Sequence, residues 1–327
     1  MLTLRRGRVS AIVSRAEGLT RIEVDGLPCV AYPRLTGPVA LDDDVIVNVQ
    51  ARELALGSGG FDVLYVNMTR GLDLAPAPGA HVMKLPYVPG QAAARHAEEG
   101  RELPETLGGL PVVCCSLHSQ VGPVCAGIGE GVRVAYVQLP GGALPVSLSD
   151  ALRALRQRGL LGTTVAVDAC VDGDVQCVSV ASALLWCAAE EFDIAVCGIG
   201  PGVVGTGSSF GHGGLAAAWA ISAARALGGA PILAVRASEG DPRERHRGVS
   251  HHVRDVLRLC ANDVVAAWPK GFESADRLDP VELVDVTGWE AACADLPLSH
   301  MGRSASDDPL FFAAAFAAGR LARSSLS

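Results

Sequence analysis

Aromatic residues and lysines are scarce in this chain of 327 residues. Aromatic residues make up 5% of the sequence, and the 27 basic residues include only two lysines, Lys84 and Lys270. Basic charge is also in the minority, because 35 acidic residues give a formal net charge of −8. Binding to nucleic acids or to anionic membranes requires a positive field, so we expect neither partner.

The ten cysteines contain no C-x-x-C pair, which excludes zinc-ribbon and thioredoxin-like patterns. Most of them lie inside apolar runs, where a free thiol packs like a small hydrophobic side chain. The opening residues MLTLRRGRVS lack the apolar segment of a signal peptide. The longest apolar run near the C-terminus, residues 309–318, is too short to span a bilayer. We therefore expect a cytoplasmic protein with reduced thiols.

With 49% hydrophobic and 19% charged residues, the chain has enough apolar surface for a large core. Residues 1–71 contain β-branched residues with a rough period of two, and Asp25-Gly26 provides a hairpin turn. This pattern predicts a small antiparallel β domain that resembles a barrel. Residues 72–110 are rich in proline and charge, and we predict a linker there.

Strands and helices alternate over residues 111–327. The predicted strands are near-continuous apolar runs, as in strands buried on both faces, and cover 111–117, 133–139, 163–169, 192–199, 231–237, 263–268 and 281–286. Such alternation predicts an α/β domain with a doubly wound, mostly parallel, Rossmann-like sheet.

The intervening segments have helical patterns. Ser147-Leu-Ser-Asp150 fits a capping box, and Gly159 is a suitable helix stop. A further helix is predicted to begin near Val253. The last helix is apolar almost all round at its start, so we expect it to be buried in the core or against a second copy in a homodimer.

Polar residues and glycines follow five consecutive strands. In sheets of this class, ligands bind beyond the carboxyl ends of the strands. His118 and Ser119 follow the first strand, Asp168 ends the third, a glycine-rich loop over 198–214 follows the fourth, and DPRERHRGVSHHV (241–253) follows the fifth. We predict a site at this edge of the sheet.

The glycine-rich loop is compatible with three kinds of site. Gly200, Gly202 and Gly205 match the dinucleotide pattern G-x-G-x-x-G, although the helix should then begin at the third glycine. Ser209 lies in G-x-S-x-G and precedes Asp241 and His251 in the order of a hydrolase triad, but the sharp strand-to-helix turn is missing. We favour a third site, in which the backbone N–H groups from Gly200 to Gly207, including those of Gly205 and Thr206, surround an anion. A purely structural crossover remains an alternative.

The cluster at 241–253 combines arginines with histidines. Arg243, Arg245 and Arg247 are suited to binding a phosphate or carboxylate, and His246, His251 and His252 to proton transfer or metal binding. A solvated loop is the simpler alternative. A metal site is another, and it would need ligands from outside the cluster, such as His118 or Asp168, because these histidines cannot share one helical face. We predict no metal ligands.

Several motifs resemble those of a bacterial family known only as a domain of unknown function. They are GGALP, GPG-x-x-GTG, RERHRG-x-SHH, MGR at 301–303 and AYP-x-L-x-G. The resemblance covers nearly the whole chain. One departure is GSGG at 57–60, where the family has GTGG; the family also has threonine rather than serine in the GTG loop, which argues against Ser209 as a nucleophile. The resemblance implies no activity or cofactor.

We therefore expect an enzyme that acts on a small anionic molecule, phosphorylated or nucleotide-like. The anion would lie on the glycine-rich loop and the three arginines, with His246 or His251 transferring protons and His118 or Asp168 opposite them. The alternatives are a non-catalytic metabolite sensor or assembly protein and an NAD-linked oxidoreductase.

Overall fold

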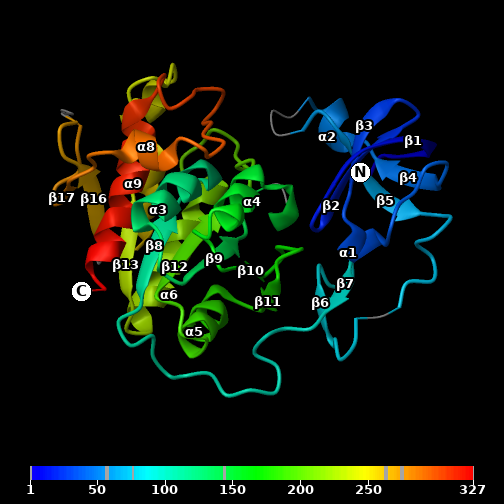
Figure 1. Ribbon diagram of the computed structural model, residues 1–327, viewed down its shortest axis with the longest axis horizontal. Helices are drawn as coiled ribbons and strands as arrows, with labels where there is room; N and C mark the ends of the chain where they lie inside the picture. The colour runs from blue at the N-terminus through cyan, green and yellow to red at the C-terminus, as the bar shows by residue number, and fades with distance from the viewer. Residues whose placement is uncertain are drawn as a thin grey trace. The chain divides into compact units, whose positions relative to one another are not determined.

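The computed structural model describes residues 2–55, 59–75, 77–142, 145–260, 264–272 and 276–326. The chain forms two compact units, Met1–Arg95 and His96–Ser327 (Figure 1). Each unit has its own hydrophobic core.

The first unit is a closed five-stranded barrel. Its strands β1 (Leu4–Ala16), β2 (Leu19–Val24), β3 (Leu27–Ala31), β4 (Asp44–Asn48) and β5 (Asp62–Asn67) pair in the order β1-β2-β3-β5-β4. All pairs are antiparallel except β3 with β5. This is the strand order of an OB-fold barrel. Asp25 and Gly26 both have positive φ, as a two-residue hairpin turn requires, so the predicted turn is confirmed.

Short elements complete this unit. Helices α1 (Pro33–Thr36) and α2 (Gln50–Glu53) connect the barrel strands, and β6 (Val82–Lys84) pairs with β7 (Ala92–Ala94). From His96 onward the chain is part of the second unit.

The second unit contains a parallel sheet of eight strands. Its order is β11-β10-β9-β12-β8-β13-β16-β17. The bounds are β8 (Pro111–Cys115), β9 (Val134–Leu139), β10 (Thr163–Val167), β11 (Val175–Cys177), β12 (Ile194–Ile199), β13 (Ala230–Ala234), β16 (Val265–Pro269) and β17 (Glu282–Val284). The predicted doubly wound α/β fold is confirmed. Sequence reasoning missed only β11 in this sheet, because three residues, two of them half-buried, give no clear periodicity.

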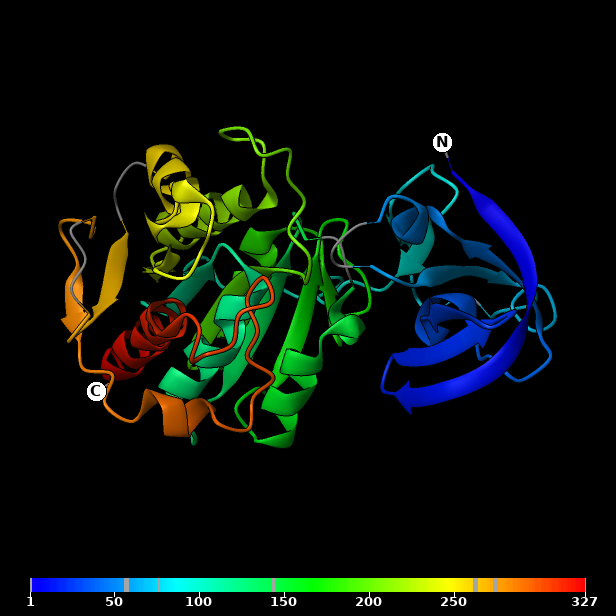
Figure 2. The same cartoon turned by 90° about the horizontal axis from the view of Figure 1, so that it is seen from above.

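Helices cover both faces of the sheet. One face carries α3 (Val121–Ile128), α4 (Asp150–Gln157), α8 (Trp289–Cys293) and α9 (Pro309–Ser324), and the other carries α5 (Val180–Ala189), α6 (Ala216–Ala226) and α7 (His251–Leu259). Figure 2 shows α8 and α9 on one side of the sheet and α7 on the other. Within the described residues, no helix is both long and apolar enough to cross a bilayer.

The apolar helix α9 is buried within its own unit. It packs on α3, where Cβ atoms added at Gly127 and Gly319 would lie 2.3 Å and 2.0 Å from backbone carbonyl oxygens of the facing helix. Only glycine permits so close an approach. This contact and the sheet cover the helix, so its apolar surface is explained within one chain. The homodimer stays a prediction.

Two predicted helix starts are wrong. Ser149, in extended conformation, caps α4 and accepts the N–H of Leu152 at 3.1 Å, while Ser147 lies in the preceding 3₁₀ turn. Helix α7 begins at His251 rather than near Val253, and its cap is Ser250. A serine caps a helix only where its own backbone is not yet helical. The residue spacing alone could not show which serine has that conformation.

The sheet has a topological switch point at β8. The chain leaves β8 toward α3 on one face, whereas it leaves the neighbouring strands β12 and β13 toward α6 and α7 on the other. Loops that diverge in this way leave a crevice beyond the carboxyl ends of the strands. The segments after β8, β12 and β13 therefore define where a ligand could bind.

Candidate functional site

A cavity of about 230 Å³ lies at this switch point. It is referred to below as the Arg/His cavity. Its lining comes from the segments after β8, β12 and β13 and from the turn before α9, and comprises Leu117, Val203, Gly205, Gly207, Ser208, His212, Arg236, Arg243, Arg245, His246, His251, His252, His300 and Met301. Three arginines and five histidines thus face one small space.

The glycine-rich loop forms a hairpin along this cavity. The N–H of Gly213 donates to the carbonyl of Val204 at 2.7 Å, and the N–H of Thr206 donates to Gly211 at 2.9 Å. The N–H of Thr206 is therefore occupied within the loop, whereas Gly205 and Gly207 line the cavity. A Cβ added at Gly207 would lie 3.9 Å from the Arg245 guanidinium, which places Arg245 beside the hairpin.

Other glycines of the loop have a packing role. A Cβ at Gly213 would lie 1.9 Å from the carbonyl oxygen of Gly141, and one at Gly142 would lie 2.2 Å from that of Gly200. These positions let the loop after β9 contact the loop after β12.

A buried ion-pair network forms the wall behind the arginines. Asp241 accepts hydrogen bonds from Nε and Nη2 of Arg243, at 2.9 and 2.7 Å, and from Arg303 Nη2 at 3.0 Å. Arg303 also donates to Asp308 at 3.1 Å. Despite the burial of Asp241, its hydrogen bonds from Arg243 and its cationic neighbours hold the pKa of its carboxyl below the ordinary value. The network fixes the direction of Arg243.

Arg236 is buried directly beyond β13. It is 2% exposed, and its Nη1 donates to His252 Nδ1 at 2.8 Å. Burial, followed by the charge of Arg243, lowers the pKa of Arg236 to about 9. Among the described residues nothing bonds its Nε, and its one nearby carboxylate, Asp241, is 3.9 Å away. A buried guanidinium so incompletely paired is suited to an anionic ligand.

Three histidines of the cavity, His246, His252 and His300, stay neutral near pH 7. Burial, with Arg236 and other arginines, lowers the pKa of His246 and of His300 to about 3. The pKa of His252 is lowered for the same reasons. Neutral imidazoles can accept protons or bind metal ions.

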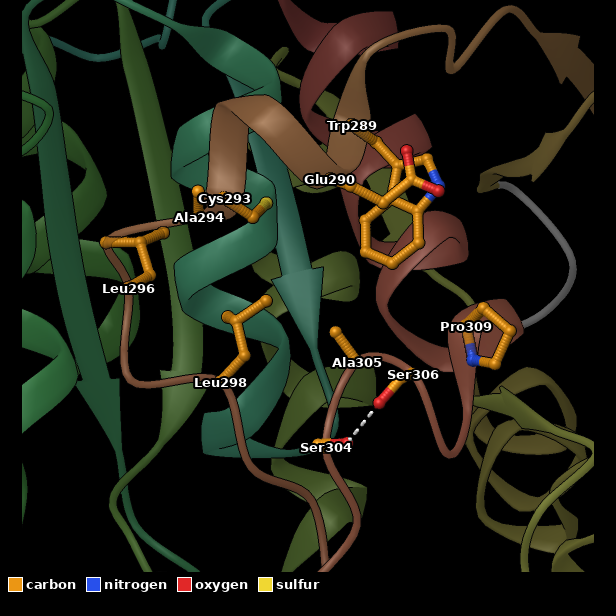
Figure 3. A pocket seen from close by; sticks show the side chains of 10 residues that line it. All are labelled: Trp289, Glu290, Cys293, Ala294, Leu296, Leu298, Ser304, Ala305, Ser306 and Pro309. Carbon is orange, nitrogen blue, oxygen red and sulfur yellow. Dashed lines mark hydrogen bonds between the residues drawn. The ribbon is translucent and has the colours of Figure 1, made fainter.

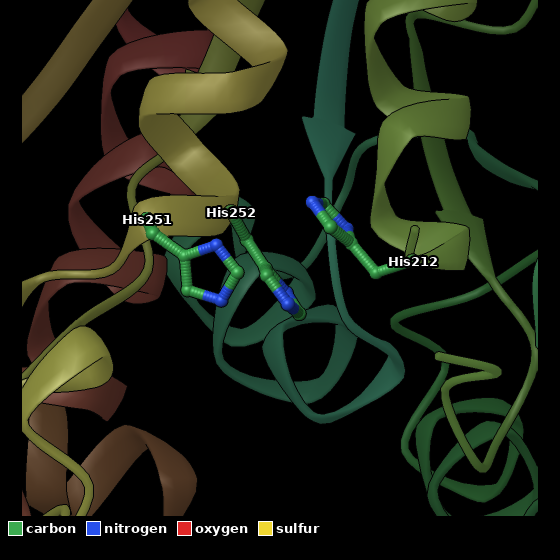
Figure 4. A group of neighbouring side chains, drawn as sticks. All are labelled: His212, His251 and His252. Atoms are coloured by element: carbon green, nitrogen blue, oxygen red, sulfur yellow. The ribbon is translucent and has the colours of Figure 1, made fainter. Parts of the chain in front are cut away.

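His212 and His251 share one carboxylate. Oδ2 of Asp255 lies 3.3 Å from Nε2 of His212 and 3.2 Å from Nδ1 of His251. His252 stacks on His212 with ring centroids 3.6 Å apart (Figure 4). The hairpin after β12 and the first turn of α7 thus meet at these rings.

The cavity contains six of the predicted site residues. They are Gly205, Gly207, Arg243, Arg245, His246 and His251. Six others do not line it, namely His118, Asp168, Gly200, Gly202, Thr206 and Arg247. Asp168 and Arg247 are exposed.

His118 is engaged in structural hydrogen bonds. Its Nε2 lies 2.7 Å from Ser149 Oγ, and its Nδ1 lies 3.2 Å from the carbonyl oxygen of Ile199. Burial lowers its pKa to about 4. It therefore ties the start of α4 to the end of β12.

The structure forms neither the hydrolase triad nor the dinucleotide-binding turn that the two motifs suggested. The carboxylate of Asp241 is bonded to arginines, while His251 bonds to Asp255, so the order Ser209, Asp241, His251 forms no triad. Helix α6 begins at Ala216, after the hairpin, so Gly205 does not open a helix as the dinucleotide pattern requires.

Sequence reasoning missed three lining residues. Arg236 is the first charged residue after a buried strand, His212 lies between two glycines in the loop, and His300 precedes the MGR motif. Their positions beyond strand ends or beside glycines were the available signal, but no sequence motif connects the three residues with one another.

A second, larger cavity lies elsewhere. It has a volume of about 540 Å³ beside α8 and the start of α9, and its lining includes Trp289, Cys293, Leu296 and Leu298 (Figure 3). Glu290 is the only charged residue among its lining residues. The Arg/His cavity therefore carries the candidate chemistry.

Comparison with known families matches residues 28–319 to a family model described as "Protein of unknown function (DUF3866)". No curated protein matches the chain.

Proposed function

The chain belongs to the DUF3866 family, and we propose that it is an enzyme acting on a small anionic molecule, phosphorylated or nucleotide-like, in the Arg/His cavity. The observation that carries the proposal is the convergence of Arg236, Arg243 and Arg245 on the same small cavity as neutral histidines. Arginines in a partly enclosed site recognise phosphate or carboxylate groups, and neutral imidazoles transfer protons.

The surroundings of each residue suggest its role in this proposal. Arg245 is exposed, has no ion-pair partner among the described residues, and lies beside the hairpin at Gly207, so it would bind the anion directly. Arg236 would add charge from the buried wall. His246 and His251, with ring centroids 4.9 Å apart, would transfer protons. His118 and Asp168 lie outside the cavity lining, and we assign them no step.

The free cysteines support a reducing compartment. None of the ten takes part in a disulfide in the described chain, and nine of them are buried. Unpaired thiols persist in the cytoplasm, where we place the protein.

A thermal-shift screen tests the anion site. The panel holds inorganic phosphate, nucleotides, sugar phosphates and NAD, applied to the full chain. A ligand at a hundred times its Kd stabilises the folded state by about 2.7 kcal/mol, which raises Tm by several degrees. We expect one anion class to do so in the wild type and in Arg247→Ala, but not in Arg245→Ala. Equal shifts in both variants would contradict the assignment.

The fate of the bound ligand separates an enzyme from a sensor. The ligand found in the screen is incubated with the protein and then analysed by chromatography. We expect conversion in the wild type and at least a tenfold slower conversion in His246→Ala or His251→Ala. Recovery of unchanged ligand from the wild type would support the sensor instead.

A further inference from the structure

Three histidines of the Arg/His cavity lie close enough to bind one metal ion. His212 ends the hairpin after β12, and His251 and His252 open α7 (Figure 4). Each offers a ring nitrogen, and these three nitrogens lie within 4.8 Å of one another. The hairpin and the helix thus bring together His212 and His252, which are 40 positions apart in the chain.

Asp255 fixes the tautomers of two of these rings. A carboxylate only accepts hydrogen bonds, so Nε2 of His212 and Nδ1 of His251 must carry the protons that face its Oδ2. The lone pairs then belong to Nδ1 of His212 and Nε2 of His251. Both atoms are buried and have no hydrogen-bond partner among the described residues. A carboxylate behind a histidine is the usual arrangement that orients metal ligands.

His252 can join the other two after one local movement. Its Nδ1 accepts a hydrogen bond from Arg236, so its proton lies on Nε2. Its ring is parallel to that of His212, at 8°, and two stacked rings cannot both point their in-plane lone pairs at one ion. Binding therefore requires His252 to tilt out of the stack and to release Arg236.

We propose that His212, His251 and His252 form a site for a divalent transition-metal ion of the zinc class, with Asp255 as its positioning residue. Three nitrogen ligands leave a fourth position open, which is the pattern of catalytic rather than structural zinc sites. This site goes beyond the anion-binding proposal and does not depend on it. If both are correct, the ion and the released Arg236 would face the same anion, and proton transfer would fall to His246 because His251 would be a ligand of the ion.

Isothermal titration of the metal-stripped full chain with Zn²⁺ alone tests the site. We expect one ion per chain. His251→Ala, whose side chain is partly exposed and easily replaced, should weaken binding at least a hundredfold. Asp255→Asn keeps the shape but removes the negative charge that makes both rings more basic, and should weaken binding ten- to a hundredfold. His81→Ala, an exposed histidine of the barrel unit, is the matched control and should bind as the wild type does.

Co²⁺ absorption provides a second measurement. Bound Co²⁺ should show the intense visible bands of a four-coordinate site in the wild type and lose them in His251→Ala, while circular dichroism confirms that the variant is folded. If His251→Ala does not fold, His251→Gln takes its place. No stoichiometric binding, or unchanged binding in the folded variant, would overturn the proposal. Phosphate binding by the metal-stripped protein is measured separately. A negative result with metal ions therefore does not decide whether the anion site exists.

Discussion

The two parts of the carboxyl edge of the sheet carry similar residue types in different states. Near the end of β9, His118 has both ring nitrogens bonded, one to Ser149 Oγ and one to the carbonyl of Ile199. Beyond β12 and β13 and in the turn before α9, the ring nitrogens Nδ1 of His212 and Nε2 of both His251 and His300 have no partner within the described chain. Buried polar atoms without partners are costly in a stable fold, so their concentration marks a site.

This difference teaches that residue type alone does not identify a functional histidine. His118 and His251 both follow a strand or loop at the same edge, yet one has both nitrogens bonded and the other presents a lone pair to a cavity. If the two parts differ in this way, substitutions near His118 should change stability, and substitutions in the Arg/His cavity should change ligand binding or turnover.

The largest effect on stability is expected from Asp241→Ala. The variant removes the carboxylate between Arg243 and Arg303 and leaves the charges of Arg243 and buried Arg236 without compensation, while Arg303 keeps its pair with Asp308. Breaking a buried pair in this way costs about 3–5 kcal/mol, measured as the free energy of unfolding in urea. Glu190→Ala breaks the exposed pair with Arg101 and should cost less than about 1 kcal/mol. Equal losses in the two variants would contradict the network.

A smaller loss of stability is expected from His118→Ala. It removes one hydrogen bond at Ser149 Oγ and one at the carbonyl of Ile199, which keep those from Leu152 and Tyr136, and the two lost bonds cost about 1–3 kcal/mol. Ligand affinity should remain within a factor of two of the wild type, whereas His251→Ala should change ligand turnover more than stability. A loss of affinity in folded His118→Ala would break the comparison, because it would extend the site to the part near the end of β9.

Acid should destabilise the α/β unit before the barrel unit. The folded-state pKa values of His118, at about 4, and of His246 and His300, at about 3, lie below the unfolded value of about 6.5. The unfolded state then binds more protons, so stability is present above pH 6.5 and is lost as pH falls toward these values, by about 1.4 kcal/mol per pH unit for each histidine. In the barrel unit the pKa of Asp43 is lowered despite burial, and its contribution is lost only below about pH 4.

The four tryptophans make this pH dependence measurable. Trp186, Trp219, Trp268 and Trp289 all belong to the second unit, so their fluorescence during urea unfolding reports on that unit alone. The unfolding midpoint should fall between pH 6.5 and pH 5. A midpoint that is constant over this range would show that these histidines do not stay neutral in the folded state.

The smallest effect is expected from Ser209→Ala. Ser209 is exposed and does not line the Arg/His cavity, so conversion of the ligand should stay within a factor of two of the wild-type rate. A complete loss of turnover would instead revive a serine nucleophile.

The fold was largely predictable from the sequence because its signals are local. Long apolar runs and the glycines at turns marked the parallel strands, and Asp25-Gly26 marked the first hairpin. The short strand β11, the helix α3 and the cap at Ser149 were not predicted, because they depend on packing partners from distant parts of the chain. Helix α3, for example, is wholly buried and has no amphipathic pattern.

The site was predictable in position but only partly in composition. Strand ends identified Arg243, Arg245, His246 and His251. The hairpin that brings His212 to α7 depends on backbone pairing between Val204 and Gly213, and no motif encodes that pairing. The role of Asp255 depends on helical register once α7 is known to begin at His251, which the sequence alone placed two residues too late.

A crystal structure of the full chain with the ligand identified by the thermal-shift screen tests the central claim most directly. The proposed function predicts that its anionic group lies in the Arg/His cavity, bonded to Arg236 and Arg245 beside Gly205 and Gly207. Ligand density at the ends of β9 and β10, near His118 and Asp168, would contradict it.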